Sequence, residues 1–300
     1  MSPNASPAPG YDGQGPFMRL TRLGLALTQR LWPALAERAA LRLFGTPLPP
    51  RWLRRRRPWP AHWTAERQPF ERASLTLYRD RRSRPEAAAV LLVHGWGGHA
   101  GQLLPLAETL ARAGLQVLLL DMPAHGRSTG LTSNLPQFAR ALEYTTARLC
   151  AQGLDLHGVV AHSLGANAAA YATSRGLALR RLVLLAPPAS PHDYTRLFAR
   201  LFGLNERTRS GLQRRIEARE AILMPQFEPA AVGPRVATPT LVVHDRGDRI
   251  NAHADGAAYA RAIAGARLHS TEGLGHMRLL QDEAVQAEIT RFLAAGLSPG

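Results

Sequence analysis

The 300-residue sequence predicts an α/β fold, in which helices cover both faces of a mostly parallel β-sheet. From Ala87 onward, short apolar runs alternate with longer helical patterns, and this alternation is typical of a parallel sheet with crossover helices. One apolar run ends at Ala161 and passes directly into an alanine-rich segment. The alternation then pauses over 189–235, which has a helical pattern. With 45% hydrophobic residues, the chain can form one large domain with an insertion.

The first 65 residues differ in composition from the rest of the chain. Residues 1–16 are rich in Pro, Gly, Ser and Asn and are predicted to be a disordered tail. Two amphipathic helices are expected over 17–44, meeting at Pro33, because proline suits the first turn of the second helix. Residues 46–65 combine prolines, tryptophans and the Arg54–Arg57 run, which indicates a connector whose tryptophans dock onto the body. The alternatives are contact with an anionic membrane surface or with nucleic acid. The predicted organisation is therefore a tail at 1–16, a basic helical extension with its connector at 17–65, and a main domain at 66–300 with a lid at about 189–235.

The main domain should begin with an antiparallel edge strand and continue as strand–helix pairs. Strands are predicted over 74–78, 90–94, 117–121, 156–161, 182–186, 240–244 and 267–271. Helices are predicted over 100–113, 135–152 with Asn134 as its cap, 164–172, 194–202, 207–222, 254–264 and 282–295. The helical insertion follows the strand at 182–186, which is the fifth in this list and is taken as the sixth strand of the sheet. It would therefore lie over the carboxyl edge of the sheet, where open α/β sheets bind ligands.

The tight turn around Ser163 is the most informative stretch of the sequence. A serine on so short a strand-to-helix turn is held in a strained conformation with its hydroxyl exposed above the sheet. The neighbouring backbone must then approach closely, which requires small residues, and Ala161 and Gly165 satisfy this. The start of the following helix adds N–H groups and a partial positive charge that can stabilise an oxyanion. The alternative interpretation is a serine that only caps the helix.

A nucleophilic serine needs a base, and the base needs an acid that orients it. His276 follows the strand expected to end near Thr271, after two glycines. Asp248 lies in the loop HDRGDR, directly after the strand at 240–244. The order Ser, Asp, His, with each residue at the carboxyl end of a strand, is the order that such a fold requires.

Five stretches, LLVHGWGG, DMPAHGRS, AHSLG, LVVHDRGD and GLGHMRLL, resemble the α/β-hydrolase superfamily in sequence and order. The resemblance covers about residues 74–295 and is strongest to serine esterases and lysophospholipase-like hydrolases. It implies the α/β-hydrolase fold, with Ser163 as nucleophile, Asp248 as acid and His276 as base. It also implies an oxyanion hole formed by the backbone N–H groups of Trp96 and Leu164.

The sequence departs from the family pattern at three positions. Ala161 and Ala124 replace glycines that are usual before the nucleophile and in the DMPAHGRS loop. Asp245 stands where many relatives have glycine, so it competes with Asp248 as the acid; Asp248 is favoured because the acid usually lies a few residues beyond the strand end. We expect His94 and His125 to organise loops by hydrogen bonding. Candidate pocket residues are His162, Gly95 and Gly97.

These patterns predict a serine hydrolase that cleaves a small, apolar carboxylic ester or thioester through an acyl-enzyme on Ser163. The competing class is a non-catalytic hydrolase-fold scaffold, or a protein that binds a membrane or another partner through its basic N-terminus. No histidine clusters with Cys or carboxylates at metal-ligand spacing, and no dinucleotide fingerprint or P-loop is present. We therefore expect neither metal nor cofactor.

The net charge of +15 comes from arginine alone, which indicates biased composition as much as selection for an anionic partner. Residues 1–86 carry 16 Arg against 6 acidic residues, so most of the charge lies at the N-terminus. The single cysteine, Cys150, excludes an intramolecular disulfide, and no apolar run approaches the roughly 20 residues needed to span a bilayer. We expect a cytoplasmic protein that makes weak, salt-sensitive contact with the anionic inner face of the membrane. We expect no nucleic-acid partner.

Overall fold

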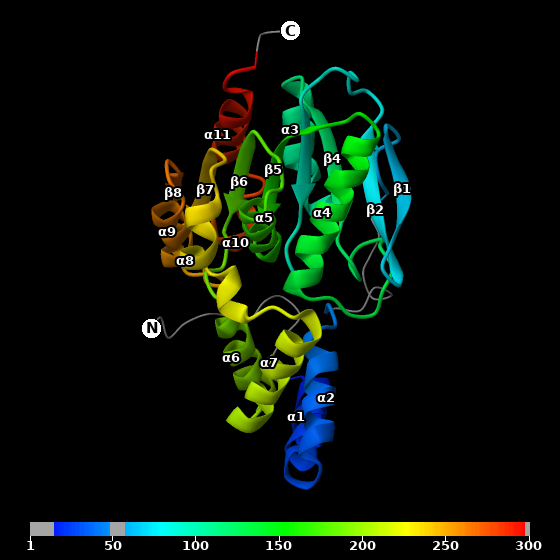
Figure 1. The fold of residues 1–300 in the computed structure, drawn as a ribbon, viewed down its shortest axis with the longest axis vertical. Helices are drawn as coiled ribbons and strands as arrows, with labels where there is room; N and C mark the ends of the chain where they lie inside the picture. The colour runs from blue at the N-terminus through cyan, green and yellow to red at the C-terminus, as the bar shows by residue number, and fades with distance from the viewer. Residues whose placement is uncertain (1–14, 49–57, 298–300) are drawn as a thin grey trace.

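The computed structural model describes residues 15–48 and 58–297 and contains one large sheet, its covering helices and a group of helices at one end (Figure 1). The predicted disordered tail, apart from its last residues, and the Arg54–Arg57 run lie outside the described residues.

The sheet has eight strands in the order β1-β2-β4-β3-β5-β6-β7-β8. β2 pairs antiparallel with β1 and β4, and the strands from β3 to β8 are parallel to one another and to β4. The strand bounds are β1 Trp63–Phe70, β2 Ala73–Asp80, β3 Ala89–Val93, β4 Gln116–Asp121, β5 Leu156–His162, β6 Arg181–Leu185, β7 Thr240–Asp245 and β8 Arg267–Thr271. This sheet confirms the predicted fold class.

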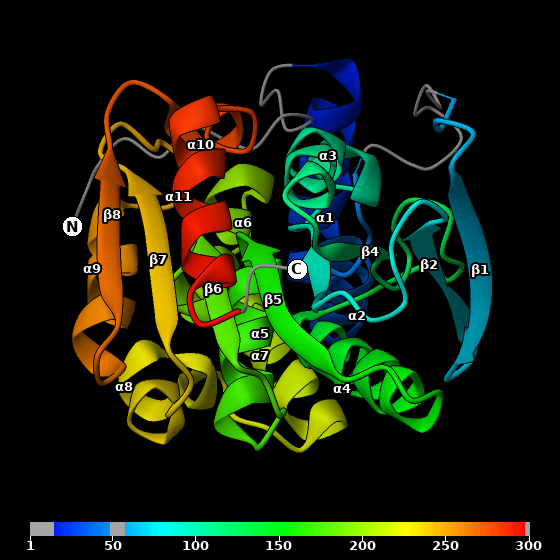
Figure 2. The ribbon, with the colours of Figure 1, turned by 90° about the horizontal axis from the view of Figure 1, so that it is seen from above.

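Helices cover both faces of the sheet (Figure 2). Alternate residues of a strand point to opposite faces, so each central strand contributes to two cores. Leu91 and Val159 pack on the face covered by α4, α5 and α9, whereas Val90, Leu92 and Val160 pack on the face covered by α3 and α11. Burial on both faces explains why these strands are continuous apolar runs. The helix bounds are α3 Leu104–Arg112, preceded by a 3-10 turn at Ala100–Leu103, α4 Leu135–Ala151, α5 Leu164–Ser174, α9 His253–Ala262, α10 Gly275–Arg278 and α11 Glu283–Ala294.

The predicted lid lies between β6 and β7. It contains α6 Pro191–Phe202, α7 Glu206–Glu220, α8 Pro229–Val232 and 3-10 turns at Met224–Phe227 and Gly233–Arg235. Gly203 ends α6 with φ of 68°, a left-handed conformation that favours glycine, and Asn205 caps α7 by accepting a hydrogen bond from Thr208 N. These signals produce a sharp turn between two helices that together stand at the carboxyl edge of the sheet (Figure 1).

The two helices before the sheet form an N-terminal hairpin, α1 Pro16–Leu31 and α2 Pro33–Phe44, which confirms the break at Pro33. The hairpin packs against α6 and α7 at the end of the molecule farthest from α11 (Figure 1). A small third core joins hairpin and lid through Met18, Leu25, Ala40, Phe198, Phe202, Leu212, Ile216 and Met224. Polar contacts reinforce it, because Arg22 Nε donates to Leu201 O at 2.6 Å and Arg215 Nε pairs with Glu37 at 2.9 Å. No helix within the described ranges is long and apolar enough to cross a membrane.

The edge of the sheet differs from the sequence prediction. The strand expected at the edge is β2, and the true edge strand, β1, begins at Trp63, inside the segment interpreted as a connector. Its sequence, WTAERQPF, does not alternate cleanly and contains Pro69, which an edge strand tolerates because one side of it needs no ladder hydrogen bonds. Trp63 is buried and Trp59 stacks on Tyr78 with ring centroids 3.8 Å apart, so these two tryptophans dock onto the body as expected.

A buried carboxylate fixes the loops at the end of β4. Asp121 Oδ2 accepts hydrogen bonds from Tyr78 OH and Arg127 N, both at 2.7 Å, and Oδ1 accepts one from Ala100 N at 2.7 Å. The carboxylate occupies the space a side chain at Gly126 would need, since a Cβ there would lie 2.0 Å from Asp121 Cγ. Asp121 therefore joins β2, the start of the α3 segment and the loop that contains His125.

We predict that Asp121→Asn lowers the free energy of unfolding by about 3 kcal/mol, because an amide places N–H groups against donors that the carboxylate now satisfies. The matched control is Asp193→Asn, whose exposed carboxylate pairs with Arg196 and whose loss should cost less than about 0.5 kcal/mol. Urea denaturation of both variants measures the difference. A loss in Asp121→Asn no larger than in the control would contradict this role of Asp121.

Candidate active site

Ser163 occupies the turn between β5 and α5 in a strained backbone conformation, with φ of 53° and ψ of −124°. A non-glycine residue at positive φ is unfavourable and persists only where its surroundings enforce it. The Ser163 amide donates to Leu185 O at 2.8 Å, and β5 brings the turn against His94. A Cβ at Gly165 would lie 2.5 Å from His94 O, so only glycine fits there. The predicted small-residue requirement is met.

His276 lies at the start of α10, after the loop that follows β8, and its ring is held by Asp248. The Nδ1–H group of His276 donates to Asp248 Oδ2 at 2.7 Å, a tautomer that leaves Nε2 unprotonated and able to accept a proton. Asp248 Oδ1 accepts from the backbone N–H groups of Ile250 at 2.8 Å and Asn251 at 3.1 Å. Burial alone would raise the pKa of the Asp248 carboxyl, but hydrogen bonds from His244 and His276 hold that pKa well below its usual range. Asp248 is therefore ionised wherever the protein is folded near neutral pH.

Asp245, the competing acid in the sequence, lies elsewhere in the loop network. Its Oδ1 accepts from Gly247 N at 2.9 Å, and its Oδ2 accepts from Thr271 Oγ1 at 2.8 Å and Leu274 N at 2.9 Å. Burial would raise the pKa of this carboxyl, but hydrogen bonds from the backbone around Leu274 lower it. Asp245 thus supports the loop that carries His276, whereas Asp248 contacts the imidazole itself.

His162 connects the turn of Ser163 directly to the His276 loop. Its Nε2–H donates to His276 O at 3.0 Å, and the two imidazole rings lie 4.6 Å apart. Burial, together with the neighbouring His276, places the pKa of His162 well below its usual value, so His162 stays neutral. His162 therefore holds the loop of His276 in place and leaves the Asp248 carboxylate as the charged group of this cluster.

Two further polar residues reach Ser163 that the sequence patterns did not single out. Asn251 Nδ2 donates to Ala186 O at 2.7 Å and approaches Ser163 Oγ at 3.5 Å, while its Oδ1 accepts from Tyr194 OH at 2.5 Å. Within the described part of the chain the Ser163 hydroxyl has no hydrogen bond to His276, and such bonds are often longer before substrate binds. Asn251 lies three residues after Asp248, and this closeness in sequence is the one signal that could have identified it. Tyr194 comes from the lid.

The loop after β3 packs against the turn of Ser163. A Cβ at Gly95 would lie 2.7 Å from Ser163 Cβ, so the backbone leading into Trp96 passes close to the hydroxyl. His94 Nδ1–H donates to Gly95 O at 2.7 Å, and its Nε2 accepts from Met122 N at 3.0 Å. His125 acts in the same way, since its Nε2 accepts from Gly97 N at 3.0 Å. Both histidines organise loops, as predicted.

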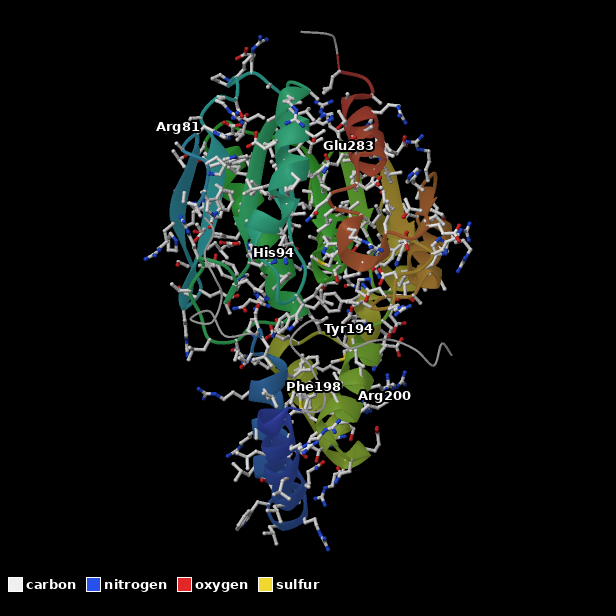
Figure 3. All side chains as sticks on the ribbon, turned by 180° about the vertical axis from the view of Figure 1, so that it is seen from behind. Arg81, His94, Tyr194, Phe198, Arg200 and Glu283 are labelled. Atoms are coloured by element: carbon white, nitrogen blue, oxygen red, sulfur yellow. The ribbon has the colours of Figure 1, made fainter. Side chains whose placement is uncertain are left out.

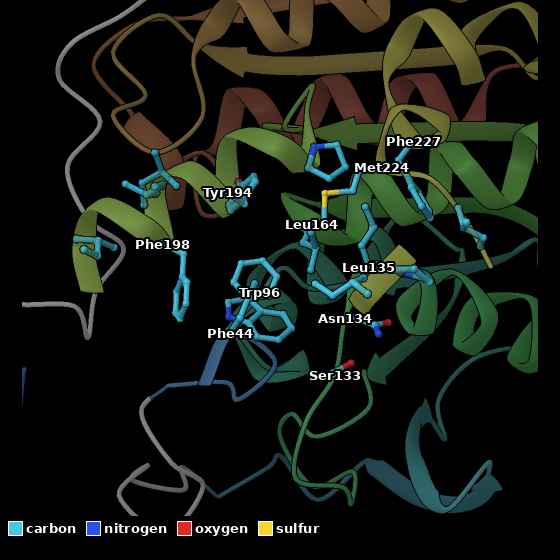
Figure 4. A pocket seen from close by; sticks show the side chains of 17 residues that line it. Phe44, Trp96, Ser133, Asn134, Leu135, Leu164, Tyr194, Phe198, Met224 and Phe227 are labelled. Carbon is cyan, nitrogen blue, oxygen red and sulfur yellow. The ribbon is translucent and has the colours of Figure 1, made fainter. Parts of the chain in front are cut away.

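An apolar cavity of about 130 Å³ opens between the sheet, the lid and the N-terminal hairpin, and Leu164, the residue after Ser163, is part of its lining. Figure 4 shows the side chains of Trp96, Leu164, Leu135 and Met224 converging on this space, and Figure 3 shows Tyr194 and Phe198 along α6 where the lid meets the body. Within the described part of the chain the lining includes no charged residue; it consists of Phe44, Trp96, Ser133, Asn134, Leu135, Pro136, Leu164, Pro191, Tyr194, Leu197, Phe198, Leu201, Ile216, Ile222, Met224, Phe227 and Ile250.

The candidate pocket residues of the sequence are not part of this lining. His162 is buried under the His276 loop, Gly95 packs against Ser163, and Gly97 donates to His125. Lid residues take their place, because a helical insertion far along the chain folds back over the carboxyl edge of the sheet. Among the residues that the structure describes, no three His, Cys, Asp or Glu side chains are grouped so that they could hold a metal ion.

Two protein-family models match the chain. Residues 84–224 match a model described as serine aminopeptidase, S33, and residues 223–300 match one described as TAP-like protein. No curated protein matches the chain.

Solved structures match over most of the chain. An esterase of Pyrococcus furiosus superposes with a TM-score of 0.62 and 18% identity, covering 81% of this chain and 97% of the esterase. A bacterial membrane phospholipase A has a TM-score of 0.59 and 16% identity, covering 93% of this chain and 97% of its own. Est1E of Butyrivibrio proteoclasticus, solved with ferulic acid, has a TM-score of 0.57 and 18% identity, covering 77% of this chain and 100% of its own. Together with the two family models and the sheet order, these matches show that the chain has the α/β-hydrolase fold.

Proposed function

We propose that this protein is a serine hydrolase that cleaves carboxylic esters or thioesters with an apolar acyl group. The observation that carries the proposal is the 2.7 Å hydrogen bond from His276 Nδ1 to the ionised Asp248, in a loop pinned by His162 to the strained turn of Ser163. A hydroxyl, a base and an orienting carboxylate are the three parts that serine acyl transfer requires.

In the first half of the reaction, Ser163 Oγ attacks the carbonyl carbon while His276 Nε2 takes its proton. The protonated imidazole lies against Asp248, whose negative charge stabilises it. The tetrahedral intermediate then expels the alcohol or thiol, which receives the proton from His276. In the second half, water attacks the acyl-enzyme with His276 as base, which releases the carboxylic acid and restores Ser163.

The oxyanion of the tetrahedral intermediate needs donors close to Ser163. The backbone N–H of Leu164 begins α5, where the helix dipole favours negative charge, and the N–H of Trp96 follows Gly95, which packs on Ser163. Each such donor contributes up to about 3–4 kcal/mol to the transition state. The side chains of both residues line the cavity, so the same two positions can bind the oxyanion and contact the acyl chain.

The cavity favours an ester over the free amino terminus of a peptide. A substrate with a charged α-amine needs a carboxylate near its binding site, because an unpaired ammonium is costly to bury. Among the residues that the structure describes, the cavity lining contains no acidic side chain, and its polar members are Ser133, Asn134 and Tyr194. The matched structures titled as an esterase and a membrane phospholipase A give further support for an ester substrate.

We predict that Ser163→Ala lowers the rate of nitrophenyl ester hydrolysis by about 10⁶-fold without loss of folding, because removal of such a serine eliminates the covalent route. The control is Ser174→Ala, since Ser174 lies at the far end of α5, where its hydroxyl donates a hydrogen bond to Tyr171 O. Both variants are assayed on a chain-length series of nitrophenyl esters and on aminoacyl nitroanilides, with circular dichroism to check the fold. Retention of more than a few per cent of activity in folded Ser163→Ala, or preference of the wild type for the anilides, would contradict the proposal.

We predict that Asp248→Asn and Asp245→Asn separate catalysis from stability. Asp248→Asn should lower kcat by about 10⁴-fold, because an amide favours the wrong tautomer of His276. Asp245→Asn should destabilise the loop by about 1–3 kcal/mol, since three donors lose a carboxylate, while folded protein keeps kcat within about tenfold. Kinetics and urea denaturation of both variants give the answer. A larger loss of kcat in Asp245→Asn than in Asp248→Asn would show that Asp245 is the acid.

A further inference from the structure

The N-terminal hairpin carries an exposed apolar surface. Of the ten large hydrophobic side chains exposed in the described residues, six belong to this hairpin. Leu20 is 71% exposed, and Leu31 and Trp32 are each 61% exposed. We call this surface the leucine face; it consists of Leu20, Leu23, Leu27, Leu31, Trp32 and Leu35.

The leucines of the leucine face that belong to α1 lie on the side of this helix that points away from the protein. With roughly 100° between successive residues of a helix, Leu20, Leu27 and Leu31 fall in one narrow stripe. Met18 and Leu25, which are buried against the lid, fall on the opposite side. The outward face of a surface helix is normally polar, so α1 has apolar residues where water should be its neighbour. The structure thus packs one side of α1 against the lid and leaves Leu20, Leu27 and Leu31 outside.

The charge around the leucine face is positive. Arg19 and Arg30 lie along one side of the leucine stripe of α1, and Arg38 and Arg42 lie on the exposed side of α2 with Leu35. Glu37 is the one acidic residue in the two helices, and it pairs with Arg215 of α7 at 2.9 Å. The hairpin therefore presents apolar side chains and unopposed arginines on one surface.

We propose that the leucine face docks onto an anionic lipid bilayer. Leucines and a tryptophan on one side, with arginines at its border, are suited to lie in the plane of the interface, with arginines at the lipid phosphates. Trp32, at the turn between α1 and α2, would lie at the depth that tryptophan prefers, between headgroups and acyl chains. The two helices should lie shallowly along the membrane surface, because neither is long and apolar enough to cross a bilayer.

Docking would also bring the cavity close to lipid. Phe44 ends α2 and lines the cavity, where its ring contacts Phe198 of α6 at a centroid distance of 5.1 Å. The hairpin thus touches the membrane with one side and forms part of the cavity wall at its end. This consequence rests on the proposed function, whereas the docking itself does not.

The test is co-sedimentation of the full-length protein with phosphatidylcholine vesicles that contain or lack phosphatidylglycerol. The variant Leu20→Gln/Leu27→Gln/Leu31→Gln removes apolar area while keeping a good helix former. Its matched control, Leu131→Gln/Leu223→Gln/Leu297→Gln, changes three exposed leucines outside the hairpin. We expect binding to anionic vesicles to fall at least tenfold in the hairpin variant and to stay within twofold in the control. Binding should also weaken in about 0.5 M salt, where the screening length is roughly 4 Å.

Two more readouts separate this proposal from its rivals. Vesicles should shift the tryptophan emission of the wild type to the blue, and Trp32→Phe should lose that shift while still binding. Light scattering without vesicles tests whether the face instead joins two copies of the chain. Equal vesicle binding by the hairpin and control variants would overturn the proposal. It would also be overturned if the wild type forms a dimer and does not bind vesicles, and the hairpin variant alone becomes a monomer. Ester hydrolysis of a water-soluble substrate should be unchanged in the hairpin variant, so failure of docking and failure of the proposed function are distinguishable.

Discussion

The strained backbone of Ser163 is the constraint on which the rest of the site depends. A non-glycine residue with φ of 53° persists here because β5, the start of α5 and the loop after β3 pack closely around it. The crowding requires glycine at position 165 against His94, and it places Gly95 of the loop after β3 against the Ser163 side chain. Ala124, which replaces a usual glycine, shares this feature, since it adopts φ of 64° in the loop next to His125. Asp121 supports that loop by accepting a hydrogen bond from Arg127 N, and His125 of the same loop accepts one from Gly97 N in the loop after β3.

In the cluster of Asp248, His162 and His276, the negative charge lies on the Asp248 carboxylate. Hydrogen bonds keep the pKa of Asp248 low, and burial keeps His162 neutral next to His276. A proton arriving on His276 would therefore meet a carboxylate at 2.7 Å and an uncharged neighbouring ring. Tyr194 remains a neutral donor, since burial raises the pKa of its phenol, and it ties the lid to Asn251. The lid thus contributes both the apolar wall of the cavity and one polar contact to the site.

Much of this arrangement could be predicted from short patterns, because local sequence controls it. Buried parallel strands, the turn of Ser163, the break at Pro33 and the insertion after the sixth strand all have strong local signals. The edge strand β1 was missed because edge strands tolerate proline and irregular alternation. The cavity lining and Asn251 were missed for another reason, since they depend on how the lid folds over the sheet, which no local pattern determines. Likewise, amphipathicity of α1 was evident in the sequence, but which side faces outward was not.

In the function that we propose, Ser163 is a nucleophile that His276 activates, and Asp248 orients the His276 imidazole. Peptide mapping by mass spectrometry after reaction with a fluorophosphonate tests it most directly, since the reagent bonds covalently to an activated serine. We expect one adduct on Ser163 in the wild-type protein, and loss of that adduct in folded His276→Ala. An adduct on another serine, or no adduct on a folded wild-type protein, would contradict the account.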